Sequence, residues 1–221
     1  MVALVLPSGA LDMNTGSGKP REASWWFASG LAVLLILVAA SFGKTRTFEG
    51  PILDDDHALV LNPHIGSFSA SSLRWVLESD FPHNPRFMPA GWLGIDFETR
   101  FTGLNPFRLH AYVLILHGLN AAILACVLRR LVLRAGSAGP FRSVLAPLAG
   151  AAFYAIHPMR AEALGWESLV FWHQAVLFAL GWAWIRLGAE PRPAAECAAY
   201  IGSVLSFPAF LGLAPAAAAV D

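Results

Sequence analysis

The sequence predicts an all-α, polytopic membrane helix bundle of about five transmembrane helices, with a long outer loop carrying short interfacial helices. The chain has 221 residues, of which 56% are hydrophobic and 14% charged, and its mean hydropathy is +0.55. A helix needs about 20 apolar residues, and at least about 17, to cross a hydrocarbon layer of ~30 Å. Five windows contain no Asp, Glu, Lys or Arg: residues 24–43, 109–128, 143–159, 168–185 and 197–220.

Each window predicts one membrane segment. The first follows Lys19 and Arg21 and begins beside Trp25 and Trp26, which suit an interfacial aromatic belt. A cleaved signal peptide is the alternative for this segment. The third and fourth windows are at the lower limit of length. The fifth contains Pro208, so we expect one kinked helix or two half-helices there.

The distribution of basic residues predicts the orientation. The connection after the second window carries four arginines and no acid: Arg129, Arg130, Arg134 and Arg142. Short loops rich in Lys and Arg face the cytoplasm. We therefore expect a cytoplasmic tail over residues 1–23 and a membrane domain over 24–221. Its first outer loop (44–108) and second outer loop (158–168) then share the outer side.

The charge balance excludes two classes of protein. The 15 basic and 15 acidic residues cancel. A disordered chain combines low hydrophobicity with high net charge, and a nucleic-acid-binding protein has a basic excess. We expect membrane lipids, and no nucleic acid, among the partners.

The first outer loop holds 14 of the 30 charged residues, but it also contains two amphipathic segments. Residues 71–78 predict a short helix with Leu73, Val76 and Leu77 on one face, and residues 91–102 repeat this pattern around several aromatic side chains. Both are expected to lie flat on the bilayer surface.

Four consecutive ionisable residues, Asp54, Asp55, Asp56 and His57, stand near the start of this loop. Adjacent carboxylates repel one another, so the pKa of at least one should be raised unless a cation lies close. Such a cluster suits general-base chemistry or cation binding, although a solvated loop is the plainer interpretation. A turn could present Asp55, Asp56 and His57 to a divalent cation.

Histidines also occur inside the membrane windows. His110 and His117 are seven residues apart and share one helix face with Asn120. Polar side chains at membrane depth face the bundle interior or a wet cavity. We expect hydrogen bonds between helices here, with ligand contact as the alternative.

The second outer loop begins where Pro158 ends the third predicted helix. Arg160, Glu162, Trp166 and Glu167 follow within ten residues. Both outer loops thus place acidic residues on the same side of the membrane. This arrangement predicts a site at the outer face, lined by both loops.

Several short motifs occur in order between residues 48 and 221. They are Asp54-Asp55 with Asn62-Pro63-His64-Ile65; Arg86 with Asp96; Gly103-Leu104-Asn105-Pro106-Phe107 with His110, His117 and Asn120; Phe153-Tyr154-Ala155-Ile156-His157-Pro158 with Glu162 and Trp166; and Leu205-Ser206. Together they resemble the transmembrane and TPR-repeat-containing O-mannosyltransferases and their bacterial relatives, which belong to the GT-C superfamily of glycosyltransferases. The chain looks like a truncated, N-terminal GT-C module.

The resemblance implies a membrane hexosyltransferase that moves a sugar from a polyprenyl-phosphate donor to a hydroxyl of a protein or glycan acceptor. The reaction would take place at the outer face of a bacterial plasma membrane or of the endoplasmic reticulum. Asp54 would be the general base, and Asp55 would support it or hold a divalent cation. The implied substrate-binding residues are Arg86, His157, Arg160, Glu162 and Trp166.

The chain departs from the family pattern in two places. The family carries a basic and acidic run after the motif tryptophan, where this chain has Val170, Phe171 and Trp172. The family's Lys-Glu after Leu-Ser is replaced by Phe207-Pro208. These departures leave open a catalytically degenerate relative, or a fragment, with a lipid-binding or assembly role. An unrelated small membrane protein, such as a transporter subunit, is a third hypothesis.

Overall fold

The structure is a computed structural model that describes residues 19–49, 56–78, 87–136, 139 and 141–213. Within these ranges the chain is helical and contains no strand. The longest helices are α1 (Lys19–Phe42), α4 (Pro106–Arg134) and α7 (Val170–Arg186). The shorter helices are α2 (Ala70–Glu78), α3 (Pro89–Thr102), α5 (Ala146–Ala155), α6 (Arg160–Gly165) and α8 (Pro193–Ser206). Single turns cover Gly43–Thr47, Asp56–Val60, Phe141–Leu145, Glu167–Leu169 and Pro208–Gly212.

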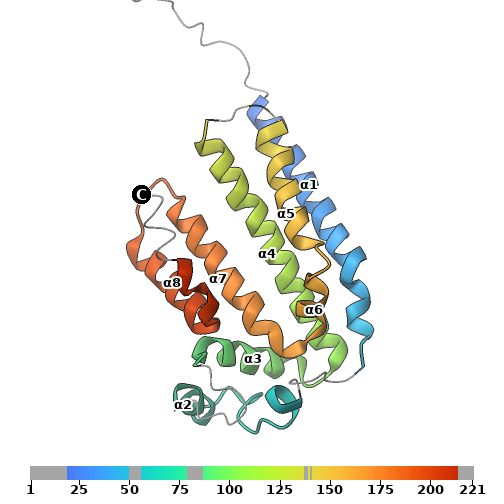
Figure 1. Ribbon diagram of the computed structural model, residues 1–221, viewed down its shortest axis with the longest axis vertical. Helices are drawn as coiled ribbons and strands as arrows, with labels where there is room; N and C mark the ends of the chain where they lie inside the picture. Colours follow the sequence, from blue (N-terminus) through green and yellow to red (C-terminus); the bar gives the residue numbers. More distant parts are fainter. Residues whose placement is uncertain (1–18, 50–55, 79–86, 137–138, 140, 214–221) are drawn as a thin grey trace, which may run out of the picture.

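The helices form a bundle that is closed at one end by two crosswise helices (Figure 1). α1, α4, α5, α7 and α8 run side by side, whereas α2 and α3 lie across one end. The connections from α1 to α4 and from α5 to α7 meet at this same end. We call it the outer end, after the orientation that the distribution of basic residues predicts.

Three stretches are long and apolar enough to cross a membrane: Ala23–Thr47, Pro106–Arg134 and Glu167–Arg186. The expected count of about five is not confirmed in the described part of the chain. α5 has 10 residues and α8 has 14, which at 1.5 Å per residue correspond to about 15 Å and 21 Å. Both are shorter than the ~30 Å of a hydrocarbon layer. α8 ends because Phe207, which precedes Pro208, is extended, as a residue before proline prefers.

Side-chain contacts between the long helices define two levels along the bundle. At one end Arg129 lies over the ring of Phe27, 4.4 Å from its centroid. At the outer end the ring of His110 contacts Phe48 and Glu167. Arg129 and His110 are 19 residues apart on α4, or about 28 Å. This separation matches the thickness of a hydrocarbon layer.

Small residues let α4 and α5 pack closely. Ala121 and Ala125 on α4 and Ala151 and Ala155 on α5 are fully buried in one cluster with apolar side chains of α1. Small side chains allow the backbones of membrane helices to approach and so increase van der Waals contact. α1 is thus part of the packed bundle.

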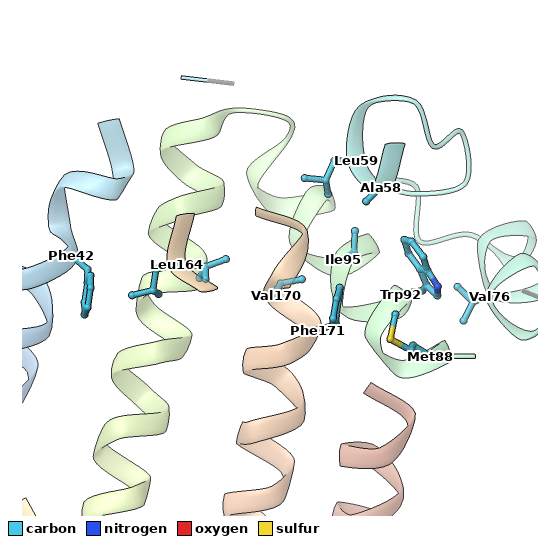
Figure 2. Close-up of a cluster of buried hydrophobic side chains, with 11 residues drawn as sticks. Phe42, Ala58, Leu59, Val76, Met88, Trp92, Ile95, Leu164, Val170 and Phe171 are labelled. Atoms are coloured by element: carbon cyan, nitrogen blue, oxygen red, sulfur yellow. The ribbon is translucent and has the colours of Figure 1, made fainter. Parts of the chain in front are cut away.

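A second apolar cluster joins the crosswise helices to the bundle (Figure 2). Trp92 and Ile95 of α3 pack between Val76 of α2 and Phe171 of α7. The amphipathic segments therefore form helices, as predicted. The expected face of α2 is divided, however, because Val76 is buried whereas Leu73 and Leu77 are exposed.

Gly91 provides a test of this packing. A Cβ atom at this position would lie 2.7 Å from the backbone oxygen of Ser206 and 2.9 Å from Cβ of Phe171. Gly91→Ala should therefore lower the stability by about 1–3 kcal/mol, as overpacking does. Gly181→Ala on α7 is the control, because nothing lies within 4 Å of the place that an added Cβ would take and alanine favours helix. Thermal unfolding in detergent should separate the two variants, and equal melting temperatures would contradict the close α3–α8 contact.

Candidate functional site

Buried and half-buried polar side chains gather near the outer end of the bundle. His117 and Asn120 come from α4, His173 from α7 and Tyr154 from α5. The ring centroid of His117 lies 5.4 Å from that of Tyr154 and 5.5 Å from that of His173. Arg160, the first residue of α6, places its guanidinium carbon 5.1 Å from the Tyr154 centroid. We call these five residues the outer polar cluster.

Three hydrogen bonds from this cluster end on backbone carbonyls. Nε2 of His117 donates to the oxygen of Ala155 (2.8 Å), and Nε2 of His173 donates to the oxygen of Ala163 (3.0 Å). Nδ2 of Asn120 donates to the backbone oxygen of His173 (2.9 Å). Ala155 is the last residue of α5, where carbonyls lack a partner within the helix. The expectation of helix–helix hydrogen bonds for His117 and Asn120 is therefore confirmed.

The same hydrogen bonds determine what the two imidazoles can still do. A carbonyl oxygen only accepts, so Nε2 carries the proton in both rings and Nδ1 of the neutral ring is an acceptor. Among the described residues, Nδ1 of His117, Nδ1 of His173 and Nε of Arg160 are buried without a hydrogen-bond partner. Buried polar atoms of this kind mark places where water or a ligand completes the hydrogen bonding. The cluster can thus accept hydrogen bonds from hydroxyl groups and attract an anion at Arg160.

A buried acid–imidazole pair lies nearer the outer boundary. Nε2 of His110 is 3.3 Å from Oε1 of Glu167, and the two side chains are 0% and 3% exposed. The ring of Phe48 packs edge-on against His110, with the centroids 5.7 Å apart. The pair links the start of α4 to the turn before α7. It thereby holds the end of the second outer loop, which carries Arg160.

The acidic run of the first outer loop is described only in part. Asp54 and Asp55, the expected general base and its neighbour, lie outside the described residues, as does Arg86. Asp56 begins a helical turn, and its Oδ1 accepts the backbone N–H of His57 (3.1 Å). No group of three potential metal ligands occurs within the described ranges. The Asp55, Asp56 and His57 metal site remains a sequence-based hypothesis.

The expected substrate-binding residues of the second outer loop do not come together in one group. Nδ1 of His157 accepts the backbone N–H of Met159 (3.2 Å), and its ring packs against Phe153. Glu162 is exposed and Trp166 is half-buried. In the described part of the chain, Arg160 is the one member of this set that belongs to the outer polar cluster, through its contact with Tyr154.

Sequence reasoning did not identify two buried polar residues. His173 lies inside the fourth charge-free window, and the rule that intramembrane histidines face the bundle interior could have found it. Glu98 is fully buried on α3, two residues after Asp96, whose Oδ1 accepts the backbone N–H of Phe68 (3.2 Å). The apolar pattern of this segment gave no signal that Glu98 is buried.

Comparison with known proteins does not add to this description. No protein-family model, curated protein or solved structure matches the chain. The fold and the site together define an all-helical protein with three candidate membrane spans and a buried polar cluster near one end. Any narrower assignment depends on the chemistry of that cluster and on the motif resemblance.

The His110–Glu167 pair can be tested by a double-mutant cycle. Glu167→Leu should destabilise the protein by about 3–5 kcal/mol, because it removes one partner of a buried pair. His110→Phe combined with Glu167→Leu should recover much of this loss, since apolar replacement of a whole buried pair is often tolerated. Thermal unfolding in detergent is the measurement. Additive effects of the two substitutions would show that the side chains are not coupled.

Proposed function

We propose that the chain is a multi-pass membrane glycosyltransferase of the GT-C class, which transfers a sugar from a polyprenyl-phosphate donor to an acceptor hydroxyl at the outer membrane face. The observation that carries this proposal is the position of Arg160. Its guanidinium lies near the outer end of the bundle, against Tyr154 and next to buried imidazoles. A lipid-linked phosphate at the outer headgroup level would meet this cation.

The depth of the cluster supports a lipid-borne substrate. His117 is seven residues along α4 from His110, or about 10 Å deeper in the bundle. Arg160 is attached above this level, on the connection between α5 and α7, and its half-buried side chain reaches Tyr154. A donor whose chain lies in the bilayer can present its phosphate here, while a protein or glycan acceptor approaches from the aqueous side.

The proposed chemistry is a single displacement with inversion. Asp54 takes the proton of the acceptor hydroxyl as its oxygen attacks the anomeric carbon of the sugar. The bond from this carbon to the phosphate oxygen breaks, and its electron pair leaves with the lipid phosphate. Arg160 stabilises the developing negative charge on that phosphate. Asp55 supports the base or holds a divalent cation; both aspartates enter from the sequence resemblance.

A catalytically degenerate relative is the second candidate, and one observation favours it. Val170 and Phe171 occupy positions where the family carries charges, and both are buried in the apolar cluster of Figure 2. Phe207, at the family's other basic position, stacks on Phe171 with the centroids 5.6 Å apart. These three positions contribute apolar packing instead of cations. Such a protein would bind a lipid-linked sugar, or help assemble a membrane complex, without transfer.

Transfer and donor binding should be measured separately on the full chain in proteoliposomes. The probes are polyprenyl-phosphate mannose and a Ser/Thr-rich peptide, with Arg74→Gln on the exposed surface of α2 as the control. Asp54→Asn should reduce transfer by about 10²–10⁴-fold, the usual contribution of a general base, and leave donor binding intact. Arg160→Gln should weaken both donor binding and transfer, because it removes the cation that meets the phosphate.

Each outcome distinguishes between the candidates. Undiminished transfer by Asp54→Asn would exclude this residue as the base, and unchanged donor binding by Arg160→Gln would exclude the phosphate contact. Donor binding without transfer by the wild-type chain would favour the degenerate relative. Neither binding nor transfer with this donor would contradict both candidates.

A further inference from the structure

We propose that the end of the bundle opposite the outer polar cluster binds anionic phospholipid headgroups through Arg129, Arg130 and Arg134. These three residues, at the end of α4, are the inner arginine cluster. The proposal concerns a different surface from the transferase site and does not depend on glycosyl transfer. It rests on how the guanidinium groups are held, on the lack of nearby carboxylates and on the level of the cluster.

Two of the arginines are held by α7. Nη1 of Arg130 donates to the backbone oxygen of Trp184 (2.7 Å), and its guanidinium carbon lies 4.2 Å from the Trp184 ring centroid. Nη2 of Arg134 donates to the oxygen of Gly188 (2.8 Å). A guanidinium has five N–H donors, so most remain available to another acceptor. Because the side chains are already positioned, less conformational entropy is lost when a phosphate binds.

Arg129 provides a separate indication of a ligand. Its guanidinium carbon lies 4.4 Å from the centroid of the Phe27 ring. Its Nε is buried and has no hydrogen-bond partner among the described residues. A phosphodiester oxygen is the type of acceptor that arginine prefers. A headgroup phosphate would therefore supply an acceptor that the described part of the protein lacks.

Acidic side chains that could neutralise the cluster are scarce. The sequence contains no Asp or Glu between Glu98 and Glu162. Where the structure describes the inner end, Glu196 pairs with Arg186 (3.2 Å). Glu190, two residues after Gly188, is exposed. No ion pair observed among the described residues involves a member of the inner arginine cluster. The three positive charges therefore keep their attraction for external anions.

The level of the cluster favours a lipid over a soluble anion. Trp25 and Trp26 precede Phe27 on α1 and are 68% and 71% exposed. Trp184, beneath Arg130, is also exposed. Tryptophan gathers at the boundary between hydrocarbon and headgroups. The arginines thus lie where phosphodiester groups of a bilayer are concentrated, and Arg129 is about 28 Å from the level of His110.

Native mass spectrometry of the full chain in a neutral detergent can test this proposal. The protein is titrated with dioleoyl-phosphatidylglycerol or dioleoyl-phosphatidylcholine, and the apparent dissociation constant of the first bound lipid is compared. The wild type should prefer phosphatidylglycerol. Each Arg→Gln substitution in the cluster should reduce this preference about fivefold, and added salt should weaken it further. Arg74→Gln on α2 should retain it.

The choice of variant distinguishes a loss of lipid binding from a loss of stability. Arg130 and Arg134 also hold α7, so replacing them can lower stability by itself. Arg129→Gln leaves both of those hydrogen bonds in place and should still reduce the preference for phosphatidylglycerol about fivefold. Equal binding of the two lipids to the wild type, or full preference in Arg129→Gln, would overturn the proposal. Displacement of phosphatidylglycerol by equimolar inorganic phosphate would instead show a site for soluble anions.

Discussion

The arrangement of this bundle depends on hydrogen bonds from buried side chains to backbone carbonyls of neighbouring helices. A bilayer supplies no hydrogen-bond partners, so polar groups at membrane depth must be satisfied within the protein. His117 meets this requirement at the end of α5, and His173 meets it at Ala163 of α6. Asn120 completes the link between α4 and α7. The relative positions of four helices, and therefore of Arg160, follow from these bonds.

At both ends of the bundle, side chains donate hydrogen bonds to backbone carbonyls, but the donor groups differ. At the inner end, Arg130 and Arg134 donate to carbonyls in and just after the last turn of α7. At the outer end, the imidazoles of His117 and His173 perform this role, and both rings are buried inside the bundle. Fully charged guanidinium groups remain partly exposed, where anions can approach. The neutral, buried imidazoles instead keep Nδ1 acceptors suited to hydroxyl groups.

Because of these differences, the transferase proposal and the lipid proposal depend on different residues. The transferase proposal needs a cation near the outer boundary and a carboxylate base, and Arg160 is the described residue that meets the first requirement. The buried side chains of Val170 and Phe171 argue against the transferase proposal, because they place hydrocarbon where the family that the chain resembles has charges. The lipid proposal depends on neither point. It requires only that the inner arginine cluster lies at the level of the headgroups.

Composition along the chain was sufficient to predict the three long helices. A long window without charged residues indicates that transfer of the segment into hydrocarbon is favourable. Composition also located the break before Pro208. The same windows overestimated α5 and α8, since composition does not show where helical backbone geometry ends. Only the tertiary structure decided that His110 meets Glu167 and that His173 joins His117. Which carbonyl or carboxylate a side chain reaches depends on the packing of helices that are distant in sequence, and no local pattern encodes that distance.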